Sequence, residues 1–159
     1  YVAFMNAEAA ASTEVNAKLA WERVIAEGER YKVTAKTAGI SLRLLSATMA
    51  AENFDKALAL VTEMLKLKPQ DGDLQRRKMR VLIKLNKNDE AVKIGEKALK
   101  NSYGINEFFV VVPLAKAYIS LNKKAEAKKL VSKYLSRNEI NFSELKDTKE
   151  NLEKLNQEI

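Results

Sequence analysis

The chain has 159 residues, 47% of them hydrophobic and 31% charged, and a formal net charge of +7, so it can form one buried core or a short stack of repeats. It contains no cysteine and no histidine, which excludes disulfides, thiolate and imidazole metal ligands, and the commonest general base of enzymes. With only 5 glycines and 2 prolines, the composition favours helices joined by short polar turns. We therefore expect an all-α protein with no catalytic residue, metal or cofactor.

The first part of the sequence predicts a terminal segment and a capping helix. Because the chain begins at Tyr1, we expect it to be a processed or excised piece of a longer protein. Residues 1–5 are apolar but far too few to cross a bilayer, and no transmembrane segment is predicted. The compartment stays open between the cytoplasm and a bacterial envelope. A capping helix is expected over residues 12–31, with Ser12 as its N-cap.

Three pairs of amphipathic helices are predicted next. The second helix of each pair opens with a polar turn, a charged residue and then an alanine, and these alanines, Ala57, Ala91 and Ala127, are 34 and 36 residues apart. Apolar residues at intervals of three and four predict the partner helices over residues 40–51, 73–85 and 106–121. The breaks within each pair are short enough to force antiparallel packing.

Two residues inside these helices carry their own expectations. Gly95 costs about 1 kcal/mol relative to alanine in a helix, so it indicates a close contact between helices. Pro113 is expected either to kink its helix or to mark its true start, with an irregular entry over residues 108–112.

The end of the chain predicts a second cap. Ser143 is the expected N-cap of a helix over residues 143–159. Its apolar residues fall on one face, with glutamate and lysine opposite, which would seal the last helix pair. These apolar residues are Leu145, Leu152, Leu155 and Ile159.

The segments 38–71, 72–105 and 108–141 resemble tetratricopeptide repeats. The three alanines stand at the family's second-helix alanine, and Pro69 at its terminating proline. Leu114, Ala115 and Tyr118 match the leucine, small and tyrosine positions of the first helix. The sequence departs from the family at the first-helix tryptophan, replaced by Ser41, Gln75 and Val111, and at the turn glycine, replaced by Asn86 and Asn122.

This resemblance implies a right-handed α-solenoid of antiparallel helix hairpins. Residues 1–37 would be the N-terminal segment and cap, residues 38–141 the three repeats, and residues 142–159 the C-terminal cap. The family binds protein segments in the concave groove lined by the first helix of each repeat. The implied groove residues are Leu42, Ser46, Met49, Arg76, Arg80, Ile83, Lys84, Phe109, Val112, Lys116 and Ser120.

The implied groove is apolar at one end and cationic in the middle. Arg76 and Arg80 are four residues apart and share a helix face, so they could clamp a carboxylate or a phosphate. The chaperone-binding subclass uses a lysine and an asparagine where this chain has Leu42 and Ser46, so that subclass is disfavoured. A protein or peptide partner of acidic character is the leading expectation.

Several alternatives stay open beside that expectation. All of the excess positive charge lies within residues 72–141. Lysine-rich helix faces that are merely exposed to solvent would give the same distribution of charge. Nucleic-acid association is disfavoured because aromatic residues make up only 7% of the chain and no nucleic-acid motif is present. Self-association through the terminal helices is a third reading. We interpret two acidic pairs as residues that stabilise helix N-termini through the helix dipole, namely Asp71 with Asp73 and Asp89 with Glu90.

Overall fold

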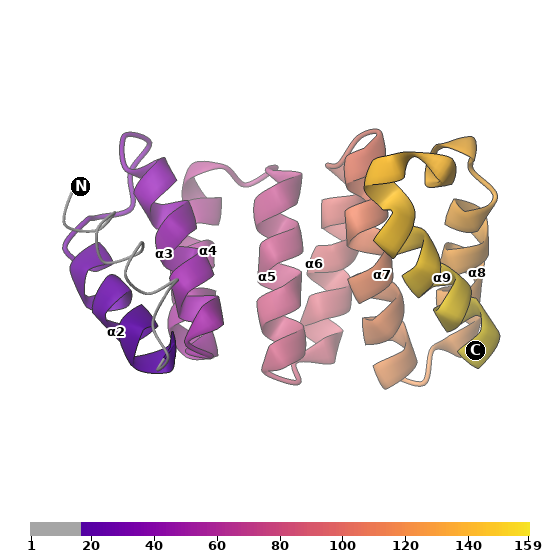
Figure 1. Cartoon of the computed structure of the whole chain (residues 1–159), viewed down its shortest axis with the longest axis horizontal. Coiled ribbons are helices and arrows are strands. Elements are labelled where there is room, and N and C mark those ends of the chain that lie inside the picture. The colour runs from indigo at the N-terminus through magenta and orange to yellow at the C-terminus, as the bar shows by residue number, and fades with distance from the viewer. Residues whose placement is uncertain (1–16) are drawn as a thin grey trace. The chain divides into compact units, whose positions relative to one another are not determined.

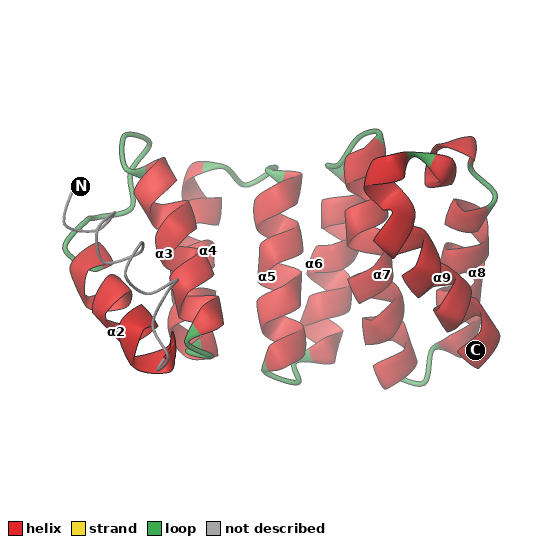
Figure 2. Cartoon of the chain, viewed as in Figure 1, coloured by secondary structure: helices red, strands yellow, loops and turns green. Residues whose placement is uncertain are grey.

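The computed structural model describes residues 17–159, and every regular element in this part of the chain is helical (Figures 1 and 2). The predicted all-α class is therefore confirmed. The first part of the predicted capping helix, with its N-cap Ser12, lies outside the described residues. The chain forms two compact units, Tyr1–Pro69 and Gln70–Ile159.

The first unit contains three described helices, α2 (Ala17–Gly28), α3 (Ala38–Ala50) and α4 (Phe54–Leu67). Helix α3 contacts both of the others. Apolar residues of α2 and α3 form the core, and Trp21 and Tyr31 pack against it while remaining partly exposed. Trp21 and Tyr31 thus serve packing, because both lie against buried aliphatic residues of this core.

The second unit contains five α-helices (Figure 1): α5 (Gly72–Lys84), α6 (Asn88–Lys100), α7 (Ile105–Ser120), α8 (Lys124–Leu135) and α9 (Lys146–Glu158). Two 3₁₀ turns, η1 (Asn138–Asn141) and η2 (Ser143–Leu145), connect α8 to α9. Each helix packs on the next one, and α7 also contacts α5 and α9. Helix α7 is therefore the central element of this unit.

Two local predictions in the second unit are wrong, namely a helix start at Pro113 and an N-cap at Ser143. Helix α7 runs without interruption through Pro113, because buried residues on both sides of the proline, among them Phe108, Val111 and Leu114, hold it between α6 and α8. That packing outweighs the cost of about 3 kcal/mol that proline brings to a helix interior. Ser143 caps no helix, because η2 comes first and carries Leu145 into the core at 0% exposure.

The turns inside the helix pairs share one backbone geometry. Glu52, Asn86 and Asn122 all have φ of 58°, in the left-handed region, and they are 34 and 36 residues apart. After each of them an amide closes the preceding helix in the same way, as when Lys87 N donates to Leu82 O at 2.9 Å. This is the Schellman pattern of helix C-termini. Its recurrence explains why asparagine can stand at two of the turn positions, since asparagine tolerates this region better than other side chains.

Glu52 is the strained member of the three turns, and Glu52→Asn is expected to stabilise the first unit. A glutamate has no local hydrogen bond to compensate a left-handed backbone, so the gain should be about 0.5–1 kcal/mol. Urea unfolding followed by circular dichroism measures it. The reverse change, Asn86→Glu, should destabilise the second unit by a similar amount. Equal stability of Glu52→Asn and the wild-type chain would contradict the explanation.

The three repeat alanines fill the same structural role. Ala57, Ala91 and Ala127 are each 0% exposed and lie in the first turns of α4, α6 and α8. A larger side chain at such a position would have to displace a neighbouring helix. The packing therefore requires a small residue at this position of each repeat, and this is why the alanines recur in the sequence.

Candidate functional site

The second unit carries a groove between α5, α7 and α9, which we call the α5–α7–α9 groove. Its volume is about 590 Å³. Helix α5 contributes two arginines, α7 contributes apolar residues and a lysine, and α9 contributes polar residues. The lining residues are Arg76, Arg80, Phe108, Phe109, Val112, Pro113, Lys116, Asp147, Thr148 and Asn151.

The floor of this groove is apolar and partly open to solvent. Phe108 is 0% exposed and belongs to the core, whereas Phe109, Val112 and Pro113 are half-buried. Adjacent residues on a helix point about 100° apart, so the two phenylalanines are buried to different depths, although Phe109 also packs against the core cluster that contains Phe108. Phe108 therefore belongs to the core, and Phe109 is the ring that remains partly exposed in the groove.

The cations of the groove differ in how far they are already neutralised. Arg76 and Arg77 both donate to the Asp73 carboxylate, Arg77 Nε at 2.7 Å from Oδ2. Partial burial opposes ionisation of Asp73, but the hydrogen bonds from Arg77 and Arg76 outweigh it and hold the pKa of Asp73 below its ordinary value. Arg80 and Lys116 are exposed, and neither forms an ion pair with a carboxylate of the described residues. Their charges therefore remain available to a ligand.

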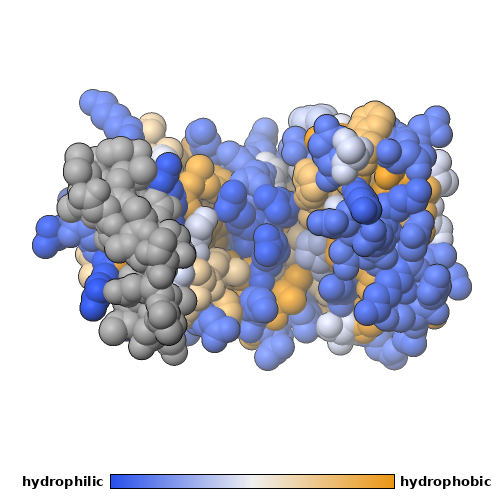
Figure 3. Space-filling model, viewed as in Figure 1, coloured by the Kyte–Doolittle hydropathy of each residue, from blue (hydrophilic) through white to orange (hydrophobic). Residues whose placement is uncertain are grey.

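Helix α9 completes the groove from the side opposite α5. It contacts α7 and α8 in the way that α7 contacts α5 and α6, so α9 stands where the first helix of a further helix pair would stand. Its carboxylate Asp147 forms no ion pair with a cation in the part of the chain that the structure describes. Asn151 donates to the backbone carbonyl of Asp147 at 2.7 Å. Hydrophilic side chains cover the face of α9 seen in Figure 3.

A family model described as "Tetratricopeptide repeat" matches residues 48–102, which reach from the end of α3 to the turn after α6. Residues 48–102 thus contain tetratricopeptide repeats, and the resemblance to that family is confirmed. Among solved structures, the chain named "MamA MSR-1 C2" is similar over 90% of this chain and 67% of its own, with a TM-score of 0.53 and 17% identity. At that identity the similarity shows a shared fold alone. No curated protein matches the chain.

The tetratricopeptide repeats give the class of function. Helical repeats of this kind present extended surfaces for other proteins, and the chain is accordingly a protein-interaction module. Among the described residues, no cluster of three carboxylates could hold a metal ion. A search of the same residues also finds no helix with the length and apolar character needed to cross a membrane.

Five of the residues that the repeat resemblance implied line the α5–α7–α9 groove, and they are Arg76, Arg80, Phe109, Val112 and Lys116. Ile83 and Lys84 lie on α5, and Ser120 is the last residue of α7. None of these last three lines the groove. The Ser120 hydroxyl instead donates to the backbone carbonyl of Lys116 at 3.0 Å.

The remaining implied residues belong to the first unit. Leu42, Ser46 and Met49 all lie on α3. Leu42 and Met49 are half-buried, and Ser46 is exposed, with its hydroxyl donating to the backbone carbonyl of Leu42 at 3.1 Å. These residues form one stripe of α3, since their spacings are four and three residues.

Sequence reasoning missed the contribution of α9 to the groove. Asp147, Thr148 and Asn151 were treated only as the polar side of a cap. A signal was present, because Asp147 and Asn151 are four residues apart and Thr148 adjoins them on the same helix face. A polar stripe of short side chains differs from the long lysines and glutamates of a merely solvated face.

Proposed function

We propose that the chain is a scaffold or adaptor that binds an acidic segment of a partner protein in the α5–α7–α9 groove. The observation that carries the proposal is the pair of exposed cations, Arg80 and Lys116, beside the half-buried floor of Phe109, Val112 and Pro113. In this proposal residues 38–71, 72–105 and 108–141 act as three repeats between two capping segments, residues 1–37 and 142–159.

The two parts of the groove would contribute differently to binding. A side chain inserted on the floor gains about 25 cal/mol for each Å² of apolar surface that it buries. The cations add less to the affinity, but they select acidic sequences and orient them. Asp147 lies on the α9 side and would repel a second carboxylate there. The partner's acidic residue should therefore face α5 and α7, with its apolar residue on the floor.

Charge reversal at Arg80 and Lys116 tests the proposal. Random peptides displayed on phage are selected against the wild-type chain, and acidic sequences with a bulky apolar residue are expected to be enriched. The Arg80→Glu, Lys116→Glu variant should then bind these peptides at least about tenfold more weakly, because attraction at two positions becomes repulsion. Arg76 is left unchanged because its reversal would also break the contact with Asp73.

The matched control is Lys93→Glu, Lys97→Glu on α6. It makes the same change in net charge at two exposed residues that lie outside the groove, so it should leave binding within about twofold of the wild-type value. The proposal would be wrong if both double variants lost affinity equally, since the attraction would then be a property of the whole basic surface. Equal binding by the groove variant and the wild-type chain would also contradict it.

A further inference from the structure

The two sides of the α5–α7–α9 groove carry opposite charges. Helix α7 packs against both α5 and α9, which lie on either side of it (Figure 1). The side formed by α5 and α7 presents the exposed cations Arg80 and Lys116, whereas the α9 side presents the exposed carboxylate of Asp147. Among the described residues that line the groove, Asp147 is the only carboxylate. The groove can therefore distinguish one side of a ligand from the other.

The charge of Asp147 is not neutralised by other residues of α9. Its carboxylate forms no ion pair within the part of the chain that the structure describes. The neighbouring lysines of the same helix, Lys146 and Lys149, do not line the groove. The ammonium of Lys149 instead donates to Asn141 Oδ1 at 2.8 Å. Asp147 therefore keeps its charge for a cation of the ligand.

The other polar residues of α9 place hydrogen-bond acceptors on the same side. Asn151 Nδ2 donates to the backbone carbonyl of Asp147 at 2.7 Å, and the side-chain oxygen of Asn151 can accept a hydrogen bond from a ligand. The hydroxyl of Thr148 lines the groove between them and can also accept one. Lysine and arginine side chains are donors only. The α9 side thus fits a basic side chain both in charge and in hydrogen bonding.

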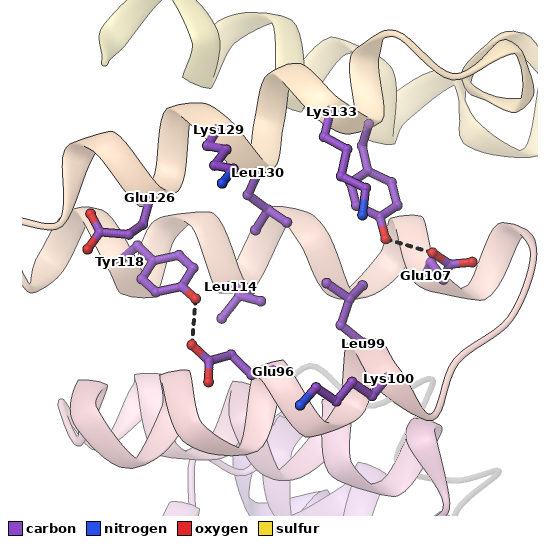
Figure 4. Close-up of a pocket in the computed structure, with 11 residues that line it drawn as sticks. Glu96, Leu99, Lys100, Glu107, Leu114, Tyr118, Glu126, Lys129, Leu130 and Lys133 are labelled. Carbon is purple, nitrogen blue, oxygen red and sulfur yellow. Dashed lines mark hydrogen bonds between the residues drawn. The ribbon is translucent and has the colours of Figure 1, made fainter.

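A groove between α6, α7 and α8 lacks this separation of charges (Figure 4). Its volume is about 510 Å³. On α6 it is lined by Glu96 and Lys100, four residues apart, and on α8 by Glu126 and Lys129, three residues apart. Both signs therefore occur on each of these two helices, and the charges of that groove favour no particular ligand. In the α5–α7–α9 groove, by contrast, each sign has its own side.

We propose that Asp147 determines the specificity of the α5–α7–α9 groove by binding a basic side chain of the partner segment. This inference rests on the proposed function, and it adds that the acidic segment carries one lysine or arginine. Acidic residues of the segment meet Arg80 and Lys116, an apolar residue lies on the floor, and the basic residue meets Asp147. A given segment then binds in one orientation only.

The width of the groove sets the spacing of the charges in the partner. The axes of packed helices are about 8–10 Å apart, so this is the approximate distance from α7, which carries Lys116, to α9, which carries Asp147. An extended segment covers that distance with about three residues. The basic residue should therefore stand about three residues from an acidic one, with the apolar residue between them.

The test uses the peptides selected by phage display on the wild-type chain. They are expected to carry a lysine or arginine about three residues from an acidic residue. In a synthetic peptide, replacing this basic residue by glutamine should weaken binding to the wild-type chain about two- to fivefold, the effect of an exposed ion pair. On the Asp147→Asn variant the same replacement should change the Kd by less than about 1.5-fold, because the charge that it met is gone.

An exchange of charges separates direct contact from an indirect effect. The Asp147→Lys variant should bind a peptide with glutamate in place of its basic residue more tightly than the original peptide. Relative to the wild-type chain, the preference between the two peptides should shift at least about tenfold, because attraction and repulsion change places. A substitution that acted only by disturbing α9 would weaken both peptides alike.

The matched control is Glu153 on the same helix. This exposed glutamate does not line the groove, and six residues after Asp147 the helix has turned by a net angle of about 240°, so Glu153 points away from the groove. Glu153→Gln and Glu153→Lys make the same changes in net charge as Asp147→Asn and Asp147→Lys. They should leave the preference for the basic residue unchanged within about 1.5-fold. Circular dichroism checks that every variant is folded.

The contrary results are distinct from a failure of the proposed function. Selected peptides without a basic residue, an Asp147→Asn variant that keeps the preference for it, or an equal shift in the Glu153 controls would each overturn the inference. If the Arg80→Glu, Lys116→Glu variant still loses affinity in those cases, the groove binds acidic segments and only the role of Asp147 is wrong. Undiminished binding by that variant would instead refute the proposed function itself.

Discussion

Phe108→Ala is expected to lower the free energy of unfolding of the second unit by about 3–5 kcal/mol, the range for removal of a buried aromatic ring. The ring is 0% exposed. It meets Tyr134 edge to face, with centroids 5.1 Å apart and planes at 87°, and the Arg137 guanidinium lies 4.8 Å from its centroid. Alanine would remove these contacts and leave a cavity among α7, α8 and α9, which share this core.

The cost should be high because the neighbours of Phe108 cannot easily collapse into the space. Arg137 is held in place by Glu107 at 2.9 Å and by Glu139 at 2.7 Å, and Tyr134 is held by its hydrogen bond to Glu107. Moving either side chain toward the cavity would break a charge-assisted hydrogen bond. The cavity therefore persists, and its cost adds to the lost transfer energy.

The neighbouring residue provides the control for Phe108→Ala. Phe109 is half-buried in the α5–α7–α9 groove, so Phe109→Ala should cost about 1 kcal/mol or less in stability. It should instead weaken the binding of groove-selected peptides by about tenfold, as expected for an apolar anchor site. Urea unfolding and peptide titration on both variants measure the contrast. Similar losses of stability in the two variants would contradict this assignment of core and groove.

Most of the fold could be predicted because its signals are local. The small residue inside each second helix and the polar turn before it are both required by the packing, so they recur in the sequence. Gly95 behaves as expected, since a Cβ there would lie 2.9 Å from Leu114 Cδ1 and 2.5 Å from Met79 Sδ. A single residue in α6 thus touches both neighbouring helices.

The errors came from features that only tertiary packing decides. Pro113 favours a break, but the buried residues around it keep α7 continuous. The burial of Leu145 delays the start of α9 beyond Ser143. The place of α9 beside α7 depends on contacts between residues far apart in the sequence. The polar stripe of α9 could therefore indicate a functional face, but not that Asp147 lies beside α7 in the groove. The ion pair between Arg76 and Asp73 does not depend on such distant contacts, because residues three positions apart on a helix are neighbours.

Gly72→Ala is expected to destabilise the second unit by about 1–3 kcal/mol, the range for overpacking a well-packed site. Gly72 is the first residue of α5 and is buried. A Cβ there would lie 2.6 Å from the backbone oxygen of Asn101 and 2.8 Å from Ser102 Oγ. Because the nearest obstacle is backbone, no side-chain rotation can relieve the contact, and the start of α5 must move away from the end of α6.

A buried hydrogen bond resists that movement. Asn101 Nδ2 donates to Gln75 Oε1 at 2.9 Å, and Gln75 is only 3% exposed. Separating the two segments would stretch this bond inside the protein, where an unsatisfied polar group costs about 1–3 kcal/mol. The clash and the hydrogen bond therefore act together, and the preference of alanine over glycine for helices, about 1 kcal/mol at most, should not compensate them.

Gly39→Ala separates the effect of packing from that of helix preference. Gly39 lies in the first turn of α3, and a Cβ there would meet nothing within 4 Å. Alanine should therefore stabilise the first unit by up to about 1 kcal/mol. Urea unfolding of both variants would give opposite signs if close backbone contact is what requires Gly72. Stabilisation by both substitutions would mean that the start of α5 moves freely, and that the Gln75–Asn101 contact does not fix its distance from α6.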